Sequence, residues 1–373
     1  MALDYLTWFK DLDVRLHGKA GHFPLYSSNV CEPLDLLGRH IRKHASELLR
    51  LQRYNDDWGH PVLLSRLAAR LKVPAASIWI TNGCTNAIYL ASRALVAKGD
   101  EVVCERPGYQ PLWAAAAEIG ARVRWLDRGP PDYRIDPVQL AKLVSRRTAM
   151  VVLTNLHNPT GAFTGDRELR AIARAVAGRS PRARILVDEV YRDFAPGKPR
   201  CAYALGRRFV SISSLSKVYG LSHLKCGWVA AERPVIERIR HWFTMAEGNG
   251  SRYLESLSAV VLAHLDEYLN RSRDIVARNR KVLCQALEPL VEDGLLSGRI
   301  PEHGCIWFPA VAGARDAGRL AGLLARRHRV HVVPGSFFGD ADRLRIGFGG
   351  EPGKVAASVE RLAGALVSLG GSA

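Results

Sequence analysis

The chain contains 373 residues with a formal net charge of +17, and 47% of its residues are hydrophobic. This length is enough for two domains with buried cores, and no apolar run is long enough to span a bilayer. The seven cysteines are dispersed, which fits reduced thiols better than a disulfide framework, and they lack the Cys/His spacing of a metal site. That spacing gives no reason to expect a metal centre. Because the N-terminal residues lack the charged-then-apolar order of a signal peptide, we expect a cytoplasmic protein.

The excess of positive charge raises the question of a nucleic-acid partner. The basic residues are mostly arginines spread along helical patterns, such as Arg66, Arg70, Arg174 and Arg179. They form no dense basic tail and no nucleic-acid motif interleaved with aromatic residues. We therefore interpret the charge as a solvated basic surface and expect neither a nucleic-acid nor a membrane partner. Attraction of an anionic cofactor or substrate remains an alternative use of the charge.

The order of apolar patterns along the chain predicts an α/β fold. Residues 1–45 form an expected N-terminal arm with aromatic residues and turn signals. From residue 46, short apolar runs alternate with amphipathic helical stretches. Strands are expected at 77–81, 101–104, 122–126, 149–154, 185–188, 209–213 and 227–231, with helices at 85–97, 112–119, 137–144 and 167–177. Such repeated alternation favours a largely parallel sheet.

The last third of the chain changes character. A mostly helical stretch occupies 234–288, and a mixed pattern then returns, with strands expected at 306–309, 330–333 and 344–348 and a helix at 317–326. We expect an N-terminal arm at 1–45 that joins the small domain, a large domain at 46–245 and a smaller α/β domain at 246–373. The sequence contains no internal repeat and no low-complexity linker.

Lys217 is the most informative residue for function. It follows a serine-rich run in Ser211-Ile-Ser-Ser-Leu-Ser-Lys217-Val-Tyr-Gly-Leu221. A lysine amine becomes a nucleophile when its pKa is lowered, and such lysines form Schiff bases with pyridoxal phosphate, PLP. Hydroxyl groups beside such a lysine can hold the phosphate of the cofactor. Taken alone, however, a serine run that ends in lysine is usually an ordinary loop.

Three further polar clusters follow expected strands, where α/β sheets gather functional groups. In the cluster Thr-Asn-Gly-Cys-Thr-Asn, Gly83, Cys84 and Thr85 would present an anion site at a helix N-terminus, or simply a helix cap. Asn158, in Asn-Pro-Thr-Gly, could donate to a ring oxygen or belong to a plain turn. Asp188 ends a buried strand, where its carboxylate would keep a pyridine nitrogen protonated or cap the next turn.

These motifs, in this order and together with Arg-Ile-Gly-Phe-Gly at 345–349, resemble the class I/II aminotransferases. That family consists of PLP enzymes of fold type I, and the resemblance spans roughly residues 50–350. It implies a mostly parallel seven-stranded sheet with a smaller α/β C-terminal domain. Each motif alone is weak, whereas five in register are specific.

The resemblance also implies a role for each matching residue. Lys217 would form the internal aldimine and then move the Cα proton of the substrate. Asp188 would pair with the pyridine N–H, while Asn158 and Tyr191 would bond the phenolic oxygen. Tyr109 would stack on the ring, the alternative being a core tyrosine after a turn. The residues expected to hold the phosphate are Gly83, Cys84, Thr85, Ser214 and Ser216.

Three more residues match parts of the family pattern that bind substrate or reach a partner subunit. Tyr54 matches the tyrosine that contacts the phosphate of the neighbouring subunit, so we expect a homodimer with active sites at the subunit interface. Arg345 matches the arginine that grips the substrate α-carboxylate. Arg343, two residues earlier in an expected strand, would share its face and is the alternative. Asn29 lies in the arm expected to close over the amino acid substrate.

One departure from the family pattern bears on the reaction. The family usually has an arginine on the cofactor phosphate where this chain has Lys225, which would bind as a point charge or simply face solvent. The same change occurs in some relatives that do not transaminate.

Transamination of an L-amino acid is the expected reaction, and elimination, replacement or cyclisation is the main alternative. Segments 27–29 and 332–339 resemble a subgroup that includes enzymes cyclising hydroxyarginines to capreomycidine or enduracididine. Decarboxylation and oxidation also remain open, as does a basic nucleic-acid-binding protein on an inactive fold of this type. The sequence does not predict the side chain of the substrate.

Overall fold

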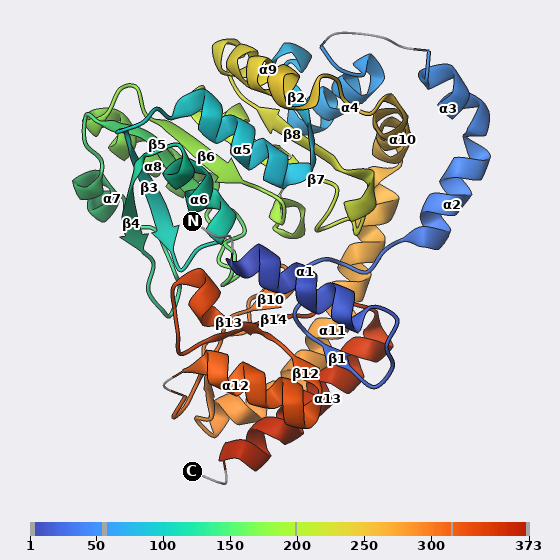
Figure 1. Ribbon diagram of the computed structural model, residues 1–373, viewed down its shortest axis with the longest axis vertical. Helices are drawn as coiled ribbons and strands as arrows, with labels where there is room; N and C mark the ends of the chain where they lie inside the picture. The colour runs from blue at the N-terminus through green and yellow to red at the C-terminus, as the bar shows by residue number, and fades with distance from the viewer. Residues whose placement is uncertain (1–3, 54–57, 198–199, 315, 371–373) are drawn as a thin grey trace.

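The computed structural model describes residues 4–53, 58–197, 200–314 and 316–370. A large seven-stranded sheet with helices on both faces forms one body, and the C-terminal strands and helices form a second body below it in Figure 1. Helix α1 (Asp4–Leu16) lies between the two bodies. Among the residues that the structure describes, no helix combines the length and the apolar character needed to cross a bilayer.

The large sheet confirms the predicted fold class. Its strands lie in the order β2-β8-β7-β6-β5-β3-β4, and β8 alone runs antiparallel to its neighbours. Each of the seven expected strands overlaps one of these. Their bounds are β2 (Ile78–Asn82), β3 (Glu101–Arg106), β4 (Arg122–Asp127), β5 (Thr148–Thr154), β6 (Arg184–Asp188), β7 (Phe209–Ser214) and β8 (Cys226–Ala230). Because the other strands are parallel, their carboxyl ends meet at one edge of the sheet.

Both faces of the sheet are covered, as its continuously apolar strands require. Successive side chains of a strand point to opposite faces. In β5, Met150 and Val152 belong to one core cluster, whereas Val151 and Leu153 belong to another. The first cluster is covered by α5 (Gly83–Leu95), α6 (Gln110–Glu118) and α9 (Arg233–Glu247), the second by α7 (Pro137–Leu143) and α8 (Asp166–Arg179).

The second body contains three small sheets. Strands β10 (Ile306–Trp307), β14 (Leu344–Gly347) and β13 (Val333–Pro334) form one, β1 (Phe23–Pro24) pairs with β12 (Val330–His331), and β9 (Leu296–Ser297) pairs with β11 (Ala310–Val311). Helices α12 (Ala317–Leu323) and α13 (Pro352–Gly370) complete it. The tail therefore has the mixed α/β character expected from its sequence.

Helix α11 (Leu265–Glu292) runs along both bodies (Figure 1). Near its start, the Tyr268 hydroxyl lies 2.9 Å from His40 Nδ1 in α2 (Leu34–Lys43). Further along, Asn279 Nδ2 donates to the carbonyl oxygens of Phe348 and Gly350, each at 2.8 Å. These contacts fix the C-terminal strands relative to the N-terminal segment.

The N-terminal arm contains helices that the sequence patterns did not predict. Helix α1 buries Tyr5 and Leu12, which are seven residues apart and so lie on one face. The glycines and prolines that follow this helix predict turns, and the spacing of Tyr5 and Leu12 was not used to predict a helix. The remaining helices around this part are α3 (Ala45–Leu51), α4 (Pro61–Leu71) and α10 (Arg252–Ala263).

A close backbone contact between β8 and the start of α5 yields a stability prediction. A Cβ added at Gly227 would lie 2.5 Å from the carbonyl carbon of Gly83. Gly227→Ala must therefore displace the start of α5, and we expect it to lower the free energy of unfolding by about 1–3 kcal/mol. Urea denaturation measures the change.

Gly178→Ala is the matched control. A Cβ there meets nothing within 4 Å, and the residue lies in α8, where alanine is the better helix former. We expect this variant to be as stable as the natural protein or slightly more stable. Equal effects of the two substitutions would contradict the contact.

Candidate active site

A cavity lies at the carboxyl edge of the large sheet. Loops after β3, β5, β6 and β7 line it together with the start of α5 and part of the N-terminal segment. Its volume is about 200 Å³. The predicted site residues among its lining are Asn29, Gly83, Cys84, Thr85, Tyr109, Asn158, Asp188, Tyr191, Ser214, Ser216, Lys217 and Lys225. Tyr54 lies outside the described residues, and Arg345 stands behind the wall formed by Asn158.

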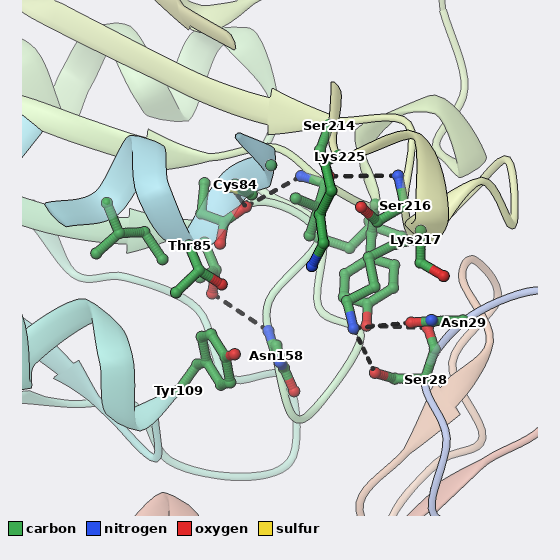
Figure 2. A pocket seen from close by; sticks show the side chains of 18 of the residues that line it. Ser28, Asn29, Cys84, Thr85, Tyr109, Asn158, Ser214, Ser216, Lys217 and Lys225 are labelled. Carbon is green, nitrogen blue, oxygen red and sulfur yellow. Dashed lines mark hydrogen bonds between the residues drawn. The ribbon is translucent and has the colours of Figure 1, made fainter. Parts of the chain in front are cut away.

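Lys217 projects its amine toward the N-terminal segment (Figure 2). Its Nζ donates to Asn29 Oδ1 at 2.8 Å and to Ser28 Oγ at 3.4 Å. Its backbone carbonyl accepts a hydrogen bond from the Val30 N–H, so the segment is attached at two points. Burial, and then the positive charge of Arg345, lower the pKa of the Lys217 amine to about 8. The amine therefore loses its proton closer to neutral pH than an exposed lysine does.

Asp188 holds a carboxylate at the end of β6. Its Oδ1 accepts from the Val190 N–H at 3.1 Å and from Cys84 Sγ at 3.7 Å. Burial raises the pKa of the Asp188 carboxyl to about 6, although the hydrogen bond from Val190 and the charge of Lys217 oppose this rise. A buried carboxylate facing the cavity would be stabilised by a cationic ring nitrogen, as the PLP expectation requires.

The opposite part of the cavity has the donors that a phosphate needs. Gly83 begins α5 with a φ of +80°, and the residues after it place their N–H groups in the first turn of that helix. Hydroxyl groups of Ser214 and Ser216 line the same cavity, and the Lys225 side chain extends into it in Figure 2. Because Gly227 has no side chain, the backbone of Gly83 can lie directly against it. This donor set fits an anionic phosphate.

Asn158 and Tyr191 are both buried and hold protein partners in this structure. The Tyr191 hydroxyl donates to the Ser28 carbonyl at 3.1 Å. Asn158 Oδ1 accepts from Arg345 Nη1 at 3.3 Å, and its backbone N–H donates to Thr154 Oγ1 at 3.2 Å. Their contact with a ring oxygen stays a prediction.

The structure separates the two candidate arginines. Arg345 is fully buried, and its Nη2 donates to the Tyr5 hydroxyl at 2.9 Å and to the Tyr26 carbonyl at 3.0 Å. Its buried Nε has no hydrogen-bond partner among the described residues. Arg343 is turned elsewhere, with its Nε donating to Asp340 Oδ2 at 2.9 Å. Arg345 is therefore the arginine adjacent to the cavity.

Tyr5 is a site residue that the sequence patterns missed. It lines the cavity, contacts Arg345 and meets the Tyr109 ring edge-on with centroids 5.6 Å apart. Its backbone N–H donates to Gln110 Oε1 at 3.0 Å. The helical spacing of Tyr5 and Leu12 could have revealed the helix, but no local signal points to the contact with Arg345.

A buried network behind the cavity was also missed. Glu105 Oε2 accepts from Arg128 Nη1 at 2.7 Å, and Glu105 Oε1 accepts from the Thr154 N–H at 2.7 Å. His157 Nε2 donates to the Pro107 carbonyl at 2.9 Å. Burial and the charge of Arg128 hold the pKa of His157 well below its usual value, so the ring is neutral. The network joins the loop that carries Tyr109 to the loop that carries Asn158.

Comparison with known proteins agrees with this arrangement. The family model described as aminotransferase class I and II matches residues 28–362. The chain belongs to this family. Capreomycidine synthase of Streptomyces vinaceus is 33% identical over 297 residues, which cover 78% of this chain and 75% of that protein.

Solved structures with related names superpose closely on the chain. YbdL of Escherichia coli, for which a methionine aminotransferase function is described, has a TM-score of 0.83 with 25% identity and 96% coverage of both chains. The PLP-dependent cyclase OrfR has a TM-score of 0.84 with 26% identity, again with 96% coverage of both chains. The family and the PLP-dependent neighbour OrfR imply PLP as the cofactor.

The lowered pKa of Lys217 predicts how the cofactor-free protein responds to pH. Below about pH 8 the lysine is charged in both the folded and the unfolded chain, and burying the charged amine opposes folding. Between about pH 8 and its ordinary pKa, the unfolded chain binds more protons, so stability rises with pH. Lys217→Met should therefore raise the free energy of unfolding at pH 7 on the order of 2 kcal/mol, and this gain should shrink above pH 8.

Denaturant titrations of cofactor-free protein between pH 7 and pH 10 measure this difference. Lys281→Met, at an exposed position on α11, is the control and should show no such pH-dependent gain. A Lys217→Met variant that is no more stable than the natural protein at pH 7 would contradict the inferred burial cost.

Proposed function

We propose that the protein is a PLP-dependent aminotransferase that transfers the amino group of an L-amino acid to a 2-oxo acid. The observation that carries this proposal is one cavity lined by the Lys217 amine, the Asp188 carboxylate and a set of phosphate donors. Arg345 stands directly behind this cavity, and the family membership gives independent support.

The residues divide the work of holding the cofactor. Asp188 would keep the ring nitrogen protonated, Tyr109 would cover the ring, and Asn158 and Tyr191 would bond its oxygen. The phosphate would be held by Gly83, Cys84, Thr85, Ser214, Ser216 and Lys225. PLP supplies an electron-withdrawing ring that stabilises negative charge at the substrate Cα.

Lys217 would bind the cofactor aldehyde and then move the proton at Cα. Its pKa of about 8 suits both proton removal and proton return near neutral pH. In the absence of cofactor, Asn29 Oδ1 accepts a hydrogen bond from Nζ. Arg345 would bind the substrate α-carboxylate, whose oxygens would replace the Tyr5 hydroxyl on Nη2.

The functional unit and its setting belong to the same proposal. We infer a cytoplasmic homodimer in which Tyr54 reaches the phosphate in the partner subunit, because Tyr54 matches the family position for that contact. We retain the division into an arm at 1–45, a large domain at 46–245 and a small domain at 246–373. Pairing of β1 in the arm with β12 supports placing the arm with the small domain.

Cyclisation of a hydroxylated amino acid is the second candidate. Its support is the 33% identity with capreomycidine synthase and the close superposition with the cyclase OrfR. Both reactions use the same lysine and the same electron-withdrawing ring, and they differ in the fate of the amino nitrogen. The presence of Lys225 in place of the usual arginine fits this candidate too.

Tracing the amino nitrogen distinguishes the two candidates. Holoenzyme is incubated with ¹⁵N-amino-labelled methionine, aspartate, arginine or hydroxyarginine, together with an unlabelled 2-oxo acid, and products are analysed by mass spectrometry. Transamination predicts the label in the amino acid formed from the acceptor, and Lys217→Ala should abolish the transfer. Label confined to ammonium or to a cyclised product would overturn the proposal in favour of the alternative.

Lys225 gives a separate prediction about the cofactor. Lys225→Gln keeps a similar side-chain length and removes the charge, so we expect PLP affinity to fall about tenfold, in keeping with one lost charge-assisted contact. Lys225→Arg should retain the affinity. Fluorescence titration of cofactor-free protein measures it, with Lys281→Gln as an exposed control. Unchanged affinity in Lys225→Gln would show that the amine does not contact the phosphate.

A further inference from the structure

Two histidines and a glutamate gather away from the cavity, where α2 meets the start of α11. His40 lies in the last turn of α2, His264 directly precedes α11, and Glu267 lies in the first turn of α11. One ligand atom from each residue lies within 4.8 Å of the other two. None of these residues lines the cavity.

The distances within this cluster match those of a metal site. His40 Nε2 lies 3.3 Å from Glu267 Oε2, and His264 Nδ1 lies 3.3 Å from Glu267 Oε1. A tetrahedral zinc ion with bonds of about 2.0–2.1 Å holds neighbouring donor atoms about 3.3–3.4 Å apart. The two imidazoles face different oxygens of the same carboxylate, each at the spacing of neighbouring donor atoms around one ion.

A hydrogen-bond partner on the far ring nitrogen of a histidine usually orients it as a metal ligand, and His40 has such a partner. His40 Nδ1 lies 2.9 Å from the Tyr268 hydroxyl, so the ring is held with Nε2 toward Glu267. The rings of His40 and His264 have centroids 4.4 Å apart, so both imidazoles lie beside the same carboxylate.

The cluster is open on one side and bordered by an unsatisfied nitrogen. The Glu267 side chain is 56% exposed and that of His40 only 7%, so an ion has access from solvent and room for water. The ring of His44 lies 4.8 Å from that of His264. His44 Nδ1 contacts Glu47, while its buried Nε2 has no hydrogen-bond partner among the described residues.

We propose that His40, His264 and Glu267 form a binding site for a divalent transition-metal ion, of which zinc fits best. Imidazole and carboxylate donors at tetrahedral spacing suit zinc, and water completes the coordination. The ion joins α2 to α11, so its role is to fasten the N-terminal segment to the helix that runs along both bodies. The site is independent of amino-group transfer.

Zinc binding by the full-length holoenzyme tests the site. Protein freed of metal with a chelator is titrated with ZnCl₂ by calorimetry, and bound zinc is counted by elemental analysis after gel filtration. We expect one tight zinc per chain and a zinc-dependent rise in melting temperature. His264→Gln and Glu267→Gln should each weaken this binding at least about tenfold, and Tyr268→Phe should weaken it similarly through His40.

His241→Gln, at an exposed histidine of α9 outside the cluster, is the matched control for zinc bound elsewhere. It should bind zinc like the natural protein. The proposal is overturned if the natural protein binds no stoichiometric zinc, or if His264→Gln and Glu267→Gln bind it as tightly as His241→Gln. His264 and Glu267 are partly exposed, so their substitution tests the site without disturbing the buried side chain of His40.

Discussion

The structure depends on burying an amine and a carboxylate at the carboxyl edge of one sheet. Both Lys217 and Asp188 have pKa values displaced toward the neutral form by burial, so each opposes folding when charged. The chain tolerates this because the strands beneath them are apolar on both faces and anchor the loops firmly. A ligand with a cationic ring nitrogen and an anionic phosphate would offset much of that cost, which links cofactor binding to stability.

The buried network behind the cavity explains how two loops can hold this arrangement. Glu105 bonds both Arg128 and the backbone of Thr154, and neutral His157 bonds the carbonyl of Pro107. Every one of these groups is buried, so losing one partner would leave another polar group unsatisfied. The loops after β3 and β5 are thereby fixed relative to each other, and with them the faces that Tyr109 and Asn158 present to the cavity.

The sequence predicts the sheet and much of the cavity lining, because buried parallel strands are apolar runs and their polar ends meet at one edge. Asp188 and Asn158 could be placed near each other on that ground alone. The contact between Arg345 and Tyr5 could not, since it joins residues 340 positions apart that share no pattern. The zinc proposal arises similarly, because His40 in α2 meets His264 and Glu267 at the start of α11, more than 200 positions away. Tertiary packing alone brings such pairs together.

The position of α1 has a practical consequence. Tyr5, in its first turn, touches Arg345 and lines the cavity, whereas α13 ends at the far end of the second body (Figure 1). A purification tag fused ahead of α1 would therefore begin near Tyr5 and the cavity that it lines. A tag placed after α13 would lie away from the cavity. The C-terminus is therefore the better position for a tag in enzyme assays.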